Sequence, residues 1–420
     1  MRIFIAVRHS INPKFFFGDL WSRNFYPALQ QLGHEIIESQ VDLLPASRFM
    51  QVPDNFTRQE QEVRSQLTQK IIDEVTTHHK KKPIDLFLSY FYNSHFDPLG
   101  FEAIHTLGIP TINFYCNSIY QFSLVSSIAA KVKFSWHSEK NAEAKYTEVG
   151  AQPVWVQMGA DPKIYYPVKE TKRVAKACFV GQRYADRDRL LAHLIHHQVP
   201  LNIFGSGWGK PHAPIQQAST NAANPLTRPL THQATNDKPQ SYLGRPILKP
   251  GSLQSYCNLI KKNIVTEGFM GGMARTISQV NYRAKSNHLN STLESVYQGF
   301  AESMIQAFSQ HELILNFSHV WADGRPGSTL IPHVRLRDFE APMSRACYLT
   351  GHTEEIGEFY TIGTEIDTYK TVDELVDKAR FYLNNPYEAE KMREAGYQRS
   401  LREHTWKNRF QQLFKAIGIS

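Results

Sequence analysis

The stretch Val334-Arg-Leu-Arg-Asp-Phe-Glu-Ala-Pro342 decides the fold that we expect for the second half of this 420-residue chain. It sets Arg335 and Arg337 just ahead of a predicted helix start, and Glu340 lies one turn into that helix. A helix N-terminus attracts phosphate groups, guanidinium groups bind them, and a carboxylate one turn in can hold a ribose diol. The stretch therefore predicts a site for a nucleoside diphosphate.

Regular elements are predicted to follow this stretch. They are a buried strand at residues 347–350, a helix opened by the capping box Thr371-Val-Asp-Glu374, a helix that begins at Pro386 and ends at Gly396, and a last helix after His404-Thr-Trp406. We expect the last helix, near residues 406–417, to cross back to the first half of the chain. This order of elements predicts an α/β unit.

The same order resembles the C-terminal half of the CgeB-like (spore-maturation-protein-like) glycosyltransferases of GT-B architecture. The motifs that carry the resemblance are Arg337-Asp-Phe-Glu340, Glu374-Leu375, Tyr382-Leu383, Ala395-Gly-Tyr397 and His404-Thr405. The resemblance is dense over residues 300–420, looser over 85–208 and absent from roughly 209–295. It implies two Rossmann-like domains with a cleft between them and a nucleotide sugar bound by the C-terminal domain.

Composition sets the broad class of the protein. Two domains of similar size are expected, because 420 residues exceed one ordinary core. The net charge of +8 favours an anionic partner, and a nucleotide sugar, a nucleic acid and an anionic membrane surface all stay open. The four cysteines form no CxxC pair, so we expect buried thiols in a reducing cytoplasm. Neither a signal peptide nor a membrane-spanning segment is expected.

Residues 1–167 alternate strand and helix signals and predict an acceptor-binding domain built on a parallel sheet. Strands are expected at 2–7, 35–38, 84–89 and 110–115, and helices at 20–32, 57–77 and 98–107. The run His78-His-Lys-Lys-Lys82 is compatible both with cations at a helix C-terminus and with a nucleic-acid patch. Residues 161–167 are expected to be the hinge to the second domain.

Residues 168–420 form the second predicted domain, which binds the nucleotide sugar and contains an insertion at about 209–295. The domain opens with a strand at 177–180, a polar loop at 181–186, a helix at 187–197 and a strand at 201–204. In the insertion, prolines up to residue 250 predict a long loop, helices are expected at 252–265 and 292–309, and the glycine-rich run 268–273 is expected to be a helix break, a lid hinge or a phosphate loop. Because the resemblance does not cover this insertion, we expect it to carry acceptor specificity.

A set of residues in the second domain is predicted to hold the donor. They are Gly181, Arg183, Arg187, Gly205, Gly207, Trp208, Arg335, Arg337 and Glu340. The arginines would stabilise the diphosphate, the glycines would let the backbone approach the base or ribose, and Trp208 would stack or pack. The resembled family has a Gly-x-x-x-x-x-Arg arrangement, which Gly181 and Arg187 match, and GT-B transferases commonly use a glutamate at the position of Glu340 for the ribose hydroxyls.

Other interpretations of these residues stay open. Arg187 can pair with Asp186 or Asp188 at a solvated helix end, and Glu340 can be a carboxylate that the helix dipole favours. Because Asp186-Arg-Asp188 has a basic centre, it is no convincing DxD motif, and we expect transfer without a metal or other cofactor. Many retaining members of the resembled fold carry a second glutamate eight residues before Glu340. Here Pro332 stands there, which leaves the stereochemistry open.

A general base is expected in the loops that follow the strands of the first domain. The candidates are His9, Asp19, His95 and Asp97, and for each of them a loop polar group or a helix cap is the competing interpretation. The chain is thus expected to transfer a sugar from a UDP- or GDP-sugar to an unidentified acceptor. An epimerase or hydrolase on the same fold, and a non-catalytic protein that binds nucleic acid or another anion, are the alternatives. Convergence of Arg187, Arg337 and Glu340 would favour the transferase.

Overall fold

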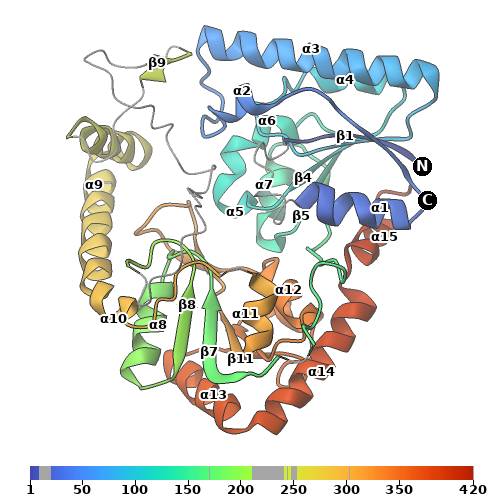
Figure 1. Cartoon of the computed structure of the whole chain (residues 1–420). Coiled ribbons are helices and arrows are strands. Elements are labelled where there is room, and N and C mark those ends of the chain that lie inside the picture. The colour runs from blue at the N-terminus through green and yellow to red at the C-terminus, as the bar shows by residue number, and fades with distance from the viewer. Residues whose placement is uncertain are drawn as a thin grey trace.

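The computed structural model describes residues 1–8, 20–169, 171–210, 241–243, 245–246, 253–301 and 303–419. Two parallel sheets dominate it, each covered by helices (Figure 1). The strand order is β2-β1-β3-β4-β5-β6 in the first sheet and β15-β14-β11-β7-β8 in the second. The expected α/β fold with two Rossmann-like halves is therefore confirmed.

The first sheet is built from short, buried strands. They are β1 (Arg2–Ala6), β2 (Glu35–Glu38), β3 (Leu86–Ser89), β4 (Thr111–Tyr115), β5 (Phe134–His137) and β6 (Pro153–Trp155). Strands of a parallel sheet covered on both faces read as continuous apolar runs, and β3 fits that pattern. Strands β5 and β6 were not predicted from the sequence, because buried Ser135 and His137 interrupt the apolar run of β5.

Helices cover both faces of the first sheet. They are η2 (Trp21–Phe25), α1 (Tyr26–Gln31), α2 (Leu44–Ser47), α3 (Arg58–Lys81), α4 (Gly100–Thr106), α5 (Ser118–Gln121), η3 (Phe122–Leu124), α6 (Ser126–Ala129), η4 (Lys140–Ala142) and α7 (Glu143–Glu148). The capping box of α3 is present: Thr57 Oγ1 accepts from Glu60 N, and Glu60 accepts from Thr57 N. The histidines and lysines from His78 to Lys81 lie in the last turn of α3, where they complement the helix dipole.

The second sheet and its helices hold most of the predicted site. Its strands are β7 (Val174–Val180), β8 (Leu201–Phe204), β11 (His311–Asn316), β14 (Tyr348–Gly351) and β15 (Asp367–Tyr369). Its helices are α8 (Arg187–His196), α10 (Asn290–Glu294), α11 (Met304–Gln310), α12 (Arg337–Met343), η5 (Glu354–Glu358), α13 (Val372–Asn384) and α14 (Pro386–Glu403). Two small antiparallel pairs complete the fold, β9 (Ser241–Tyr242) with β10 (Arg245–Pro246), and β12 (His319–Trp321) with β13 (Leu330–Pro332).

Two helix predictions in this domain were wrong. The predicted end at Gly396 does not occur, because Gly396 lies inside α14 against the backbone of Glu365: a Cβ there would lie 2.3 Å from the Glu365 carbonyl oxygen. The predicted helix at 292–309 divides into α10 and α11. Between them the backbone runs beside β8, where Ile203 N donates to Val296 O and Gln298 N donates to Ile203 O.

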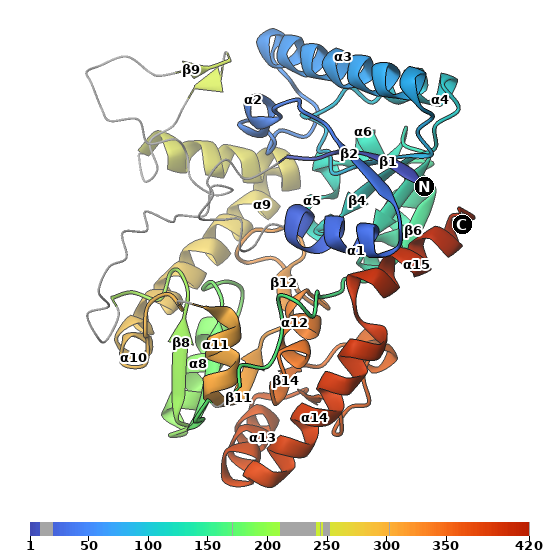
Figure 2. The ribbon, with the colours of Figure 1, turned by 45° about the vertical axis from the view of Figure 1, so that its right-hand side comes forward.

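The described part of the predicted insertion is mainly a long helical arm, α9 (Leu253–His288). The long loop predicted for residues 209–251 falls largely outside the described residues. The predicted glycine-rich turn is a single kink at Gly268, whose φ is 75°, while the chain continues as helix through Gly272. A Cβ at Gly272 would lie 2.5 Å from the Ile264 backbone, so this glycine lets the two parts of the arm pack closely. Figure 2 shows the bent arm beside the two sheets.

The last helix, α15 (Trp406–Ala416), returns to the first sheet as expected (Figures 1 and 2). The ring of Phe25 lies 4.5 Å from that of Trp406 and 5.1 Å from that of Phe410. The backbone of Ala160 pairs with the segment just before the helix: Ala160 N donates to His404 O and Trp406 N donates to Ala160 O. The two domains therefore share one apolar cluster through α15.

Candidate functional site

The loops after β7 and β8 are held together by a close backbone contact. Gly205 has φ +128°, and a Cβ on it would lie 2.2 Å from the carbonyl oxygen of Gly181. Trp208 is fully buried, and its Nε1 donates to the same carbonyl at 2.8 Å. A Cβ on Gly207 would lie 3.1 Å from Cβ of Arg183. Gly205, Gly207 and Trp208 thus position the loop in this structure, and the alternative that Trp208 packs rather than stacks is the one observed.

Arg183 is engaged by the protein itself. Its guanidinium lies 3.3 Å from Asp188 Oδ2 and donates to Asn290 Oδ1 at 2.7 Å. It also donates to the carbonyl of Ser286, at the end of the helical arm. These contacts join the loop after β7 to α9 and α10, so the arrangement supports an anchoring role for Arg183 rather than the predicted contact with the donor.

Arg187, Arg335 and Arg337 form the arginine cluster at this end of the second sheet. Arg187 begins α8 and is only 8% exposed. Burial, and next the charge of Arg335, lower the pKa of Arg187 to about 9, and the charge of Arg337 adds to the effect. A buried cation beside two further cations attracts an anion strongly.

Parts of the arginine cluster have no partner in the protein. Within the described ranges, the buried Nε atoms of Arg187 and Arg335 meet no hydrogen-bond acceptor. The acids next to Arg187 in sequence pair elsewhere: Asp186 Oδ2 lies 2.6 Å from Nδ1 of His319, and Asp188 pairs with Arg183. A buried donor without an acceptor costs about 1–3 kcal/mol. A phosphate oxygen would remove that cost.

Glu340 lies in the first turn of α12 beside Arg337. Its Oε2 is 3.2 Å from Arg337 Nη1, and its Oε1 accepts from the hydroxyl of Tyr165 at 2.6 Å. The ring of Phe308 lies 5.0 Å from the Arg337 guanidinium. Because Tyr165 belongs to the segment predicted as the hinge, its hydrogen bond to Glu340 connects α12 to the chain between the domains.

Arg335 lies where loops of both domains meet. Burial raises the pKa of Tyr120 and Glu139, which follow strands of the first sheet, and of Tyr184, which follows a strand of the second. In each case the charge of Arg335 opposes the rise. The carboxyl ends of parallel strands are where ligands of such sheets bind. Arg335 therefore lies near residues that follow strands of both sheets.

Glu139 is a buried carboxylate that the sequence analysis missed. Its Oε2 accepts from Ile119 N at 3.0 Å, and its Oε1 lies 3.0 Å from Nε2 of His333, a residue of the other domain. Burial raises the pKa of Glu139 to about 7, against the backbone donors of Ile119 and Ser118 and the charge of Arg335. Its position two residues after the end of β5 is the sequence signal that could have revealed it, because a general base is expected after a strand of the first sheet, but β5 was not among the predicted strands.

Asp338 fixes the start of α12 and was also missed. It is buried, its Oδ2 accepts from Arg335 N at 2.7 Å, and its Oδ1 accepts from the Tyr348 hydroxyl at 2.8 Å and from Thr350 Oγ1 at 3.1 Å. Asp338 thus holds the backbone of the arginine cluster against β14.

Of the four base candidates, the two that the structure describes do not lie at this junction. His9 and Asp19 lie outside the described residues. His95 is buried, lies 2.9 Å from Ser47 Oγ, and burial lowers its pKa to about 3. Asp97 Oδ1 accepts from Leu99 N, and Oδ2 lies 3.6 Å from the Arg64 guanidinium. His95 and Asp97 therefore stabilise their loop, and the competing interpretation is the observed one.

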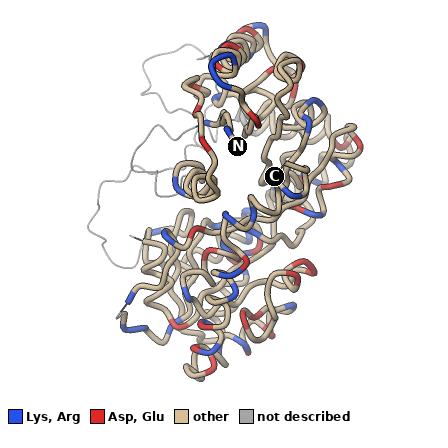
Figure 3. Tube along the Cα trace, turned by 90° about the vertical axis from the view of Figure 1, so that its right-hand side faces the viewer, with Lys and Arg blue, Asp and Glu red and all other residues tan. Residues whose placement is uncertain are grey.

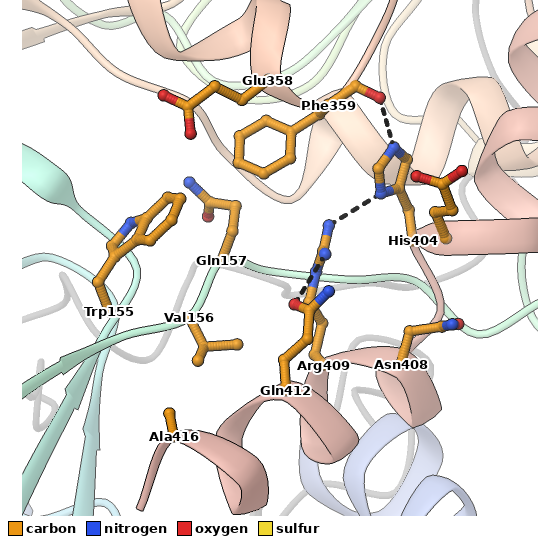
Figure 4. Close-up of a pocket in the computed structure, with 11 residues that line it drawn as sticks. Trp155, Val156, Gln157, Glu358, Phe359, His404, Asn408, Arg409, Gln412 and Ala416 are labelled. Atoms are coloured by element: carbon orange, nitrogen blue, oxygen red, sulfur yellow. Dashed lines mark hydrogen bonds between the residues drawn. The ribbon is translucent and has the colours of Figure 1, made fainter.

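A cavity of about 430 Å³ lies elsewhere, lined by Trp155 and Gln157 of the first domain and by His404 and Arg409 of the second (Figure 4). In Figure 4, His404 lies between the Phe359 carbonyl, 2.8 Å from its Nε2, and Arg409, 3.0 Å from its Nδ1. Arg409 Nε donates to Met158 O at 2.7 Å. His404 and Arg409 thus have partners in the protein, whereas the buried Nε1 of Trp155 meets no acceptor among the described residues, and the arginine cluster does not line this cavity.

Further properties concern the described residues only. They contain no group of three or more His, Cys, Asp or Glu side chains that could hold a metal ion. None of their helices is long and apolar enough to cross a membrane. All four cysteines are free thiols, and Cys178 and Cys347 are buried, but Cys257 is exposed on the arm, which corrects the expectation of burial for all four.

The chain is similar to a known family over part of its length and to solved structures over all of it. Residues 280–415 match a family described as "Glycosyl transferase-like". A glycosyltransferase from Rickettsia africae is similar in structure, with a TM-score of 0.55 at 10% identity over 100% of this chain and 99% of that one. The Anabaena protein HepE, solved with UDP and glucose, gives a TM-score of 0.52 at 10% identity over 100% and 99%.

Sucrose-phosphate synthase from Thermosynechococcus elongatus gives a TM-score of 0.50 at 11% identity over 99% of this chain and 98% of that one. The sequence matches no curated protein. These likenesses cover both domains, whereas the family match is confined to the C-terminal one. The chain therefore has a GT-B fold, and residues 280–415 of its second domain are similar to a glycosyl-transferase-like family.

Proposed function

We propose that this protein transfers a sugar from a UDP- or GDP-sugar to an acceptor, with Arg187 and Arg335 binding the diphosphate. The observation that carries the proposal is the arginine cluster, in which two buried Nε atoms lack an acceptor among the described residues. The UDP and glucose bound to HepE, a protein of the same fold, support the class of donor.

The proposed reaction needs no metal. Departure of a nucleoside diphosphate builds negative charge, which prearranged cations stabilise without reorganisation. In this site Arg187 and Arg335 provide that charge, while Glu340, held by Arg337 and Tyr165, is proposed to bind the ribose hydroxyls. The motifs around Glu340 also resemble those of the CgeB-like glycosyltransferases, and we propose that the protein belongs to that subfamily.

The rest of the proposal concerns the domain boundary, the general base, the location of the protein and the acceptor. We place the boundary between the acceptor domain, 1–167, and the donor domain, 168–420, at the hinge that contains Tyr165. His9 and Asp19 are retained as the candidate bases. A cytoplasmic location is part of the proposal, and the acceptor is left unassigned.

The alternative of a nucleic-acid-binding protein is less well supported. In the view of Figure 3, lysines and arginines are interspersed with acidic residues over both domains. Proteins that bind nucleic acid gather their cations on one face or along one helix. Within the arginine cluster Arg187 is buried and Arg335 and Arg337 are partly buried, an enclosed arrangement that fits a small anion better than a polymer.

The experiment is a thermal-shift measurement with UDP, GDP, UDP-glucose and GDP-mannose, each with and without EDTA. A ligand at 100 times its Kd stabilises a protein by about 2.7 kcal/mol. We expect stabilisation by one nucleotide and its sugar, unchanged by EDTA and lost in Arg335→Met. The control is Arg345→Met, which removes a surface arginine paired with Glu390 and Glu394.

The outcomes separate the alternatives. Loss of stabilisation on adding EDTA would refute metal independence. Release of free sugar from the donor at the same rate with and without acceptors would favour a hydrolase. Stabilisation by oligonucleotides alone would overturn the transferase proposal.

A further inference from the structure

The second part of the arm, after the kink at Gly268, turns its apolar side outward. Its exposed apolar residues are Phe269 (66% exposed), Met270 (80%), Met273 (38%), Ile277 (57%) and Val280 (59%). With about 3.6 residues per turn, these positions fall within about 100° of the helix circumference. They therefore form one continuous stripe, the arm stripe.

The opposite side of the same helix is polar and faces the protein. Gln279 is buried, the Tyr282 hydroxyl donates to the carbonyl of Ala185 at 2.9 Å, and Ser286 Oγ donates to Asp188 at 2.6 Å. Arg275 pairs with Asp323 of the β12–β13 hairpin at 2.8 Å. A helix on the surface of a globular protein normally buries its apolar side. The arm reverses that order, so its packing on the protein does not explain the arm stripe.

All but one of the charged residues on the arm are basic. Glu267 is the only acidic residue between 253 and 288, and it pairs with Arg275 at 3.0 Å. The exposed cations are Lys261, Lys262, Arg283 and Lys285. On the helix circumference Arg283 and Lys285 lie on either side of the arm stripe, where their long side chains can reach a polar boundary beside an apolar layer.

We propose that the arm stripe binds the surface of an anionic lipid bilayer. A helix with an apolar face bordered by lysine and arginine inserts that face at the level of the lipid headgroups, and its cations attract anionic lipids. A second copy of this chain is a poorer occupant, because a symmetric pairing of two arms would place their cations against one another. The arm contacts the loop after β7 through Tyr282, so a bound bilayer would lie on the opposite side of the arm from that loop.

The test is co-sedimentation of the full chain with vesicles of phosphatidylcholine alone and of phosphatidylcholine with phosphatidylglycerol. We expect binding to the anionic vesicles that weakens as salt is raised, and at least about tenfold weaker binding by a double variant, Phe269→Asp with Met270→Asp. Both side chains are exposed, so this variant should fold, and its melting temperature checks that. Leu99→Asp is the matched control, since Leu99 is 60% exposed on the first domain.

Each outcome decides the matter. Equal binding of the double variant and the wild type would overturn the proposal, as would equal binding to both kinds of vesicle. A wild-type dimer in light scattering that the double variant loses, with no vesicle binding, would assign the stripe to a second copy instead. The proposal does not rest on the proposed function: Arg335→Met is expected to bind vesicles like the wild type.

Discussion

Arg187 is a buried cation whose position favours ligand binding more than it favours folding. Replacing it by Met keeps the apolar part of the side chain against Phe179, whose ring lies 5.5 Å from the guanidinium, and removes the charge beside Arg335 and Arg337. We expect stability to be unchanged or raised by about 1 kcal/mol. Nucleotide affinity should fall about 100-fold, because a buried charge-assisted contact is lost. Calorimetric titration with UDP and GDP, together with urea unfolding, measures both.

Arg393 provides the comparison for that prediction. It is 2% exposed, but its charge is paired with Glu312 and lies 2.9 Å from Glu390. Arg393→Met should lower stability by about 3–5 kcal/mol, because the buried Glu312 loses the cation that it is paired with. Nucleotide affinity should stay as in the wild type. If Arg187→Met were the more destabilising of the two, the view of Arg187 as a ligand-binding residue would be wrong.

The raised pKa of Glu139 predicts that the stability of the protein depends on pH. Burial raises its folded pKa from 4.5 to about 7, so the folded state holds a proton that the unfolded state releases between these values. That contribution to stability is complete below pH 4.5 and is lost as pH rises to about 7, a change on the order of 3 kcal/mol. Glu139→Gln removes this dependence, so the variant should gain on the wild type between pH 4.5 and 7. If the unfolding free energies of the two proteins changed equally with pH across this range, the raised pKa of Glu139 would be wrong.

For single residues, the sequence predicted which charged side chains lie at the site better than it predicted which side chains are buried. Arg187, Arg335, Arg337 and Glu340 were chosen for their positions at helix starts, and the structure brings them to one end of the second sheet. Burial depends on what tertiary structure lays over a side chain. That is why His95, chosen as a base, proved to be enclosed beside Ser47.

Among the elements, the paired loops after β7 and β8 depend on one glycine. Gly205→Ala would place a Cβ 2.2 Å from the Gly181 carbonyl oxygen at a φ of +128°. Backbone strain and overpacking together should lower stability by about 3 kcal/mol or more. The displaced Gly181 loop should also weaken nucleotide binding, since it leads into Arg187.

Gly33 is the matched control for that change. Its φ is +79°, but a Cβ on it would meet no atom within 4 Å. Gly33→Ala therefore measures the backbone term alone, about 1 kcal/mol. Equal losses of unfolding free energy in the two variants would show that the contact between the two loops contributes nothing.

Elements were predicted correctly where local signals determine them. Thr57, Thr371 and Thr405 each cap a helix that begins at the next residue. Gly396 and the segment at 296–298 were misread, because a contact with another segment decides each of them: the Glu365 backbone beside Gly396, and β8 beside residues 296–298. A single sequence does not contain such long-range partners explicitly.

At the scale of the whole molecule, α15 couples the two domains. Phe410 is fully buried, and its ring lies 5.1 Å from Phe25 and 5.6 Å from Trp136, both in the first domain. The helix itself continues the chain of the second domain after α14. Unfolding of one domain therefore exposes apolar surface of the other, and we expect one cooperative transition for the wild type.

Phe410→Ala should weaken that coupling. Truncating a buried phenylalanine costs about 3–5 kcal/mol, and the cavity would lie between the domains. We expect the first domain to unfold at a lower temperature than the second, so that calorimetry shows two transitions in place of one. Phe381→Ala in α13, where the side chain is 48% exposed, should cost less than about 1 kcal/mol and keep a single transition. If Phe410→Ala instead shifted one intact transition downward, the domains would be coupled through other contacts, such as the hydrogen bond from Gln157 to Glu355, and α15 would not be the main connection.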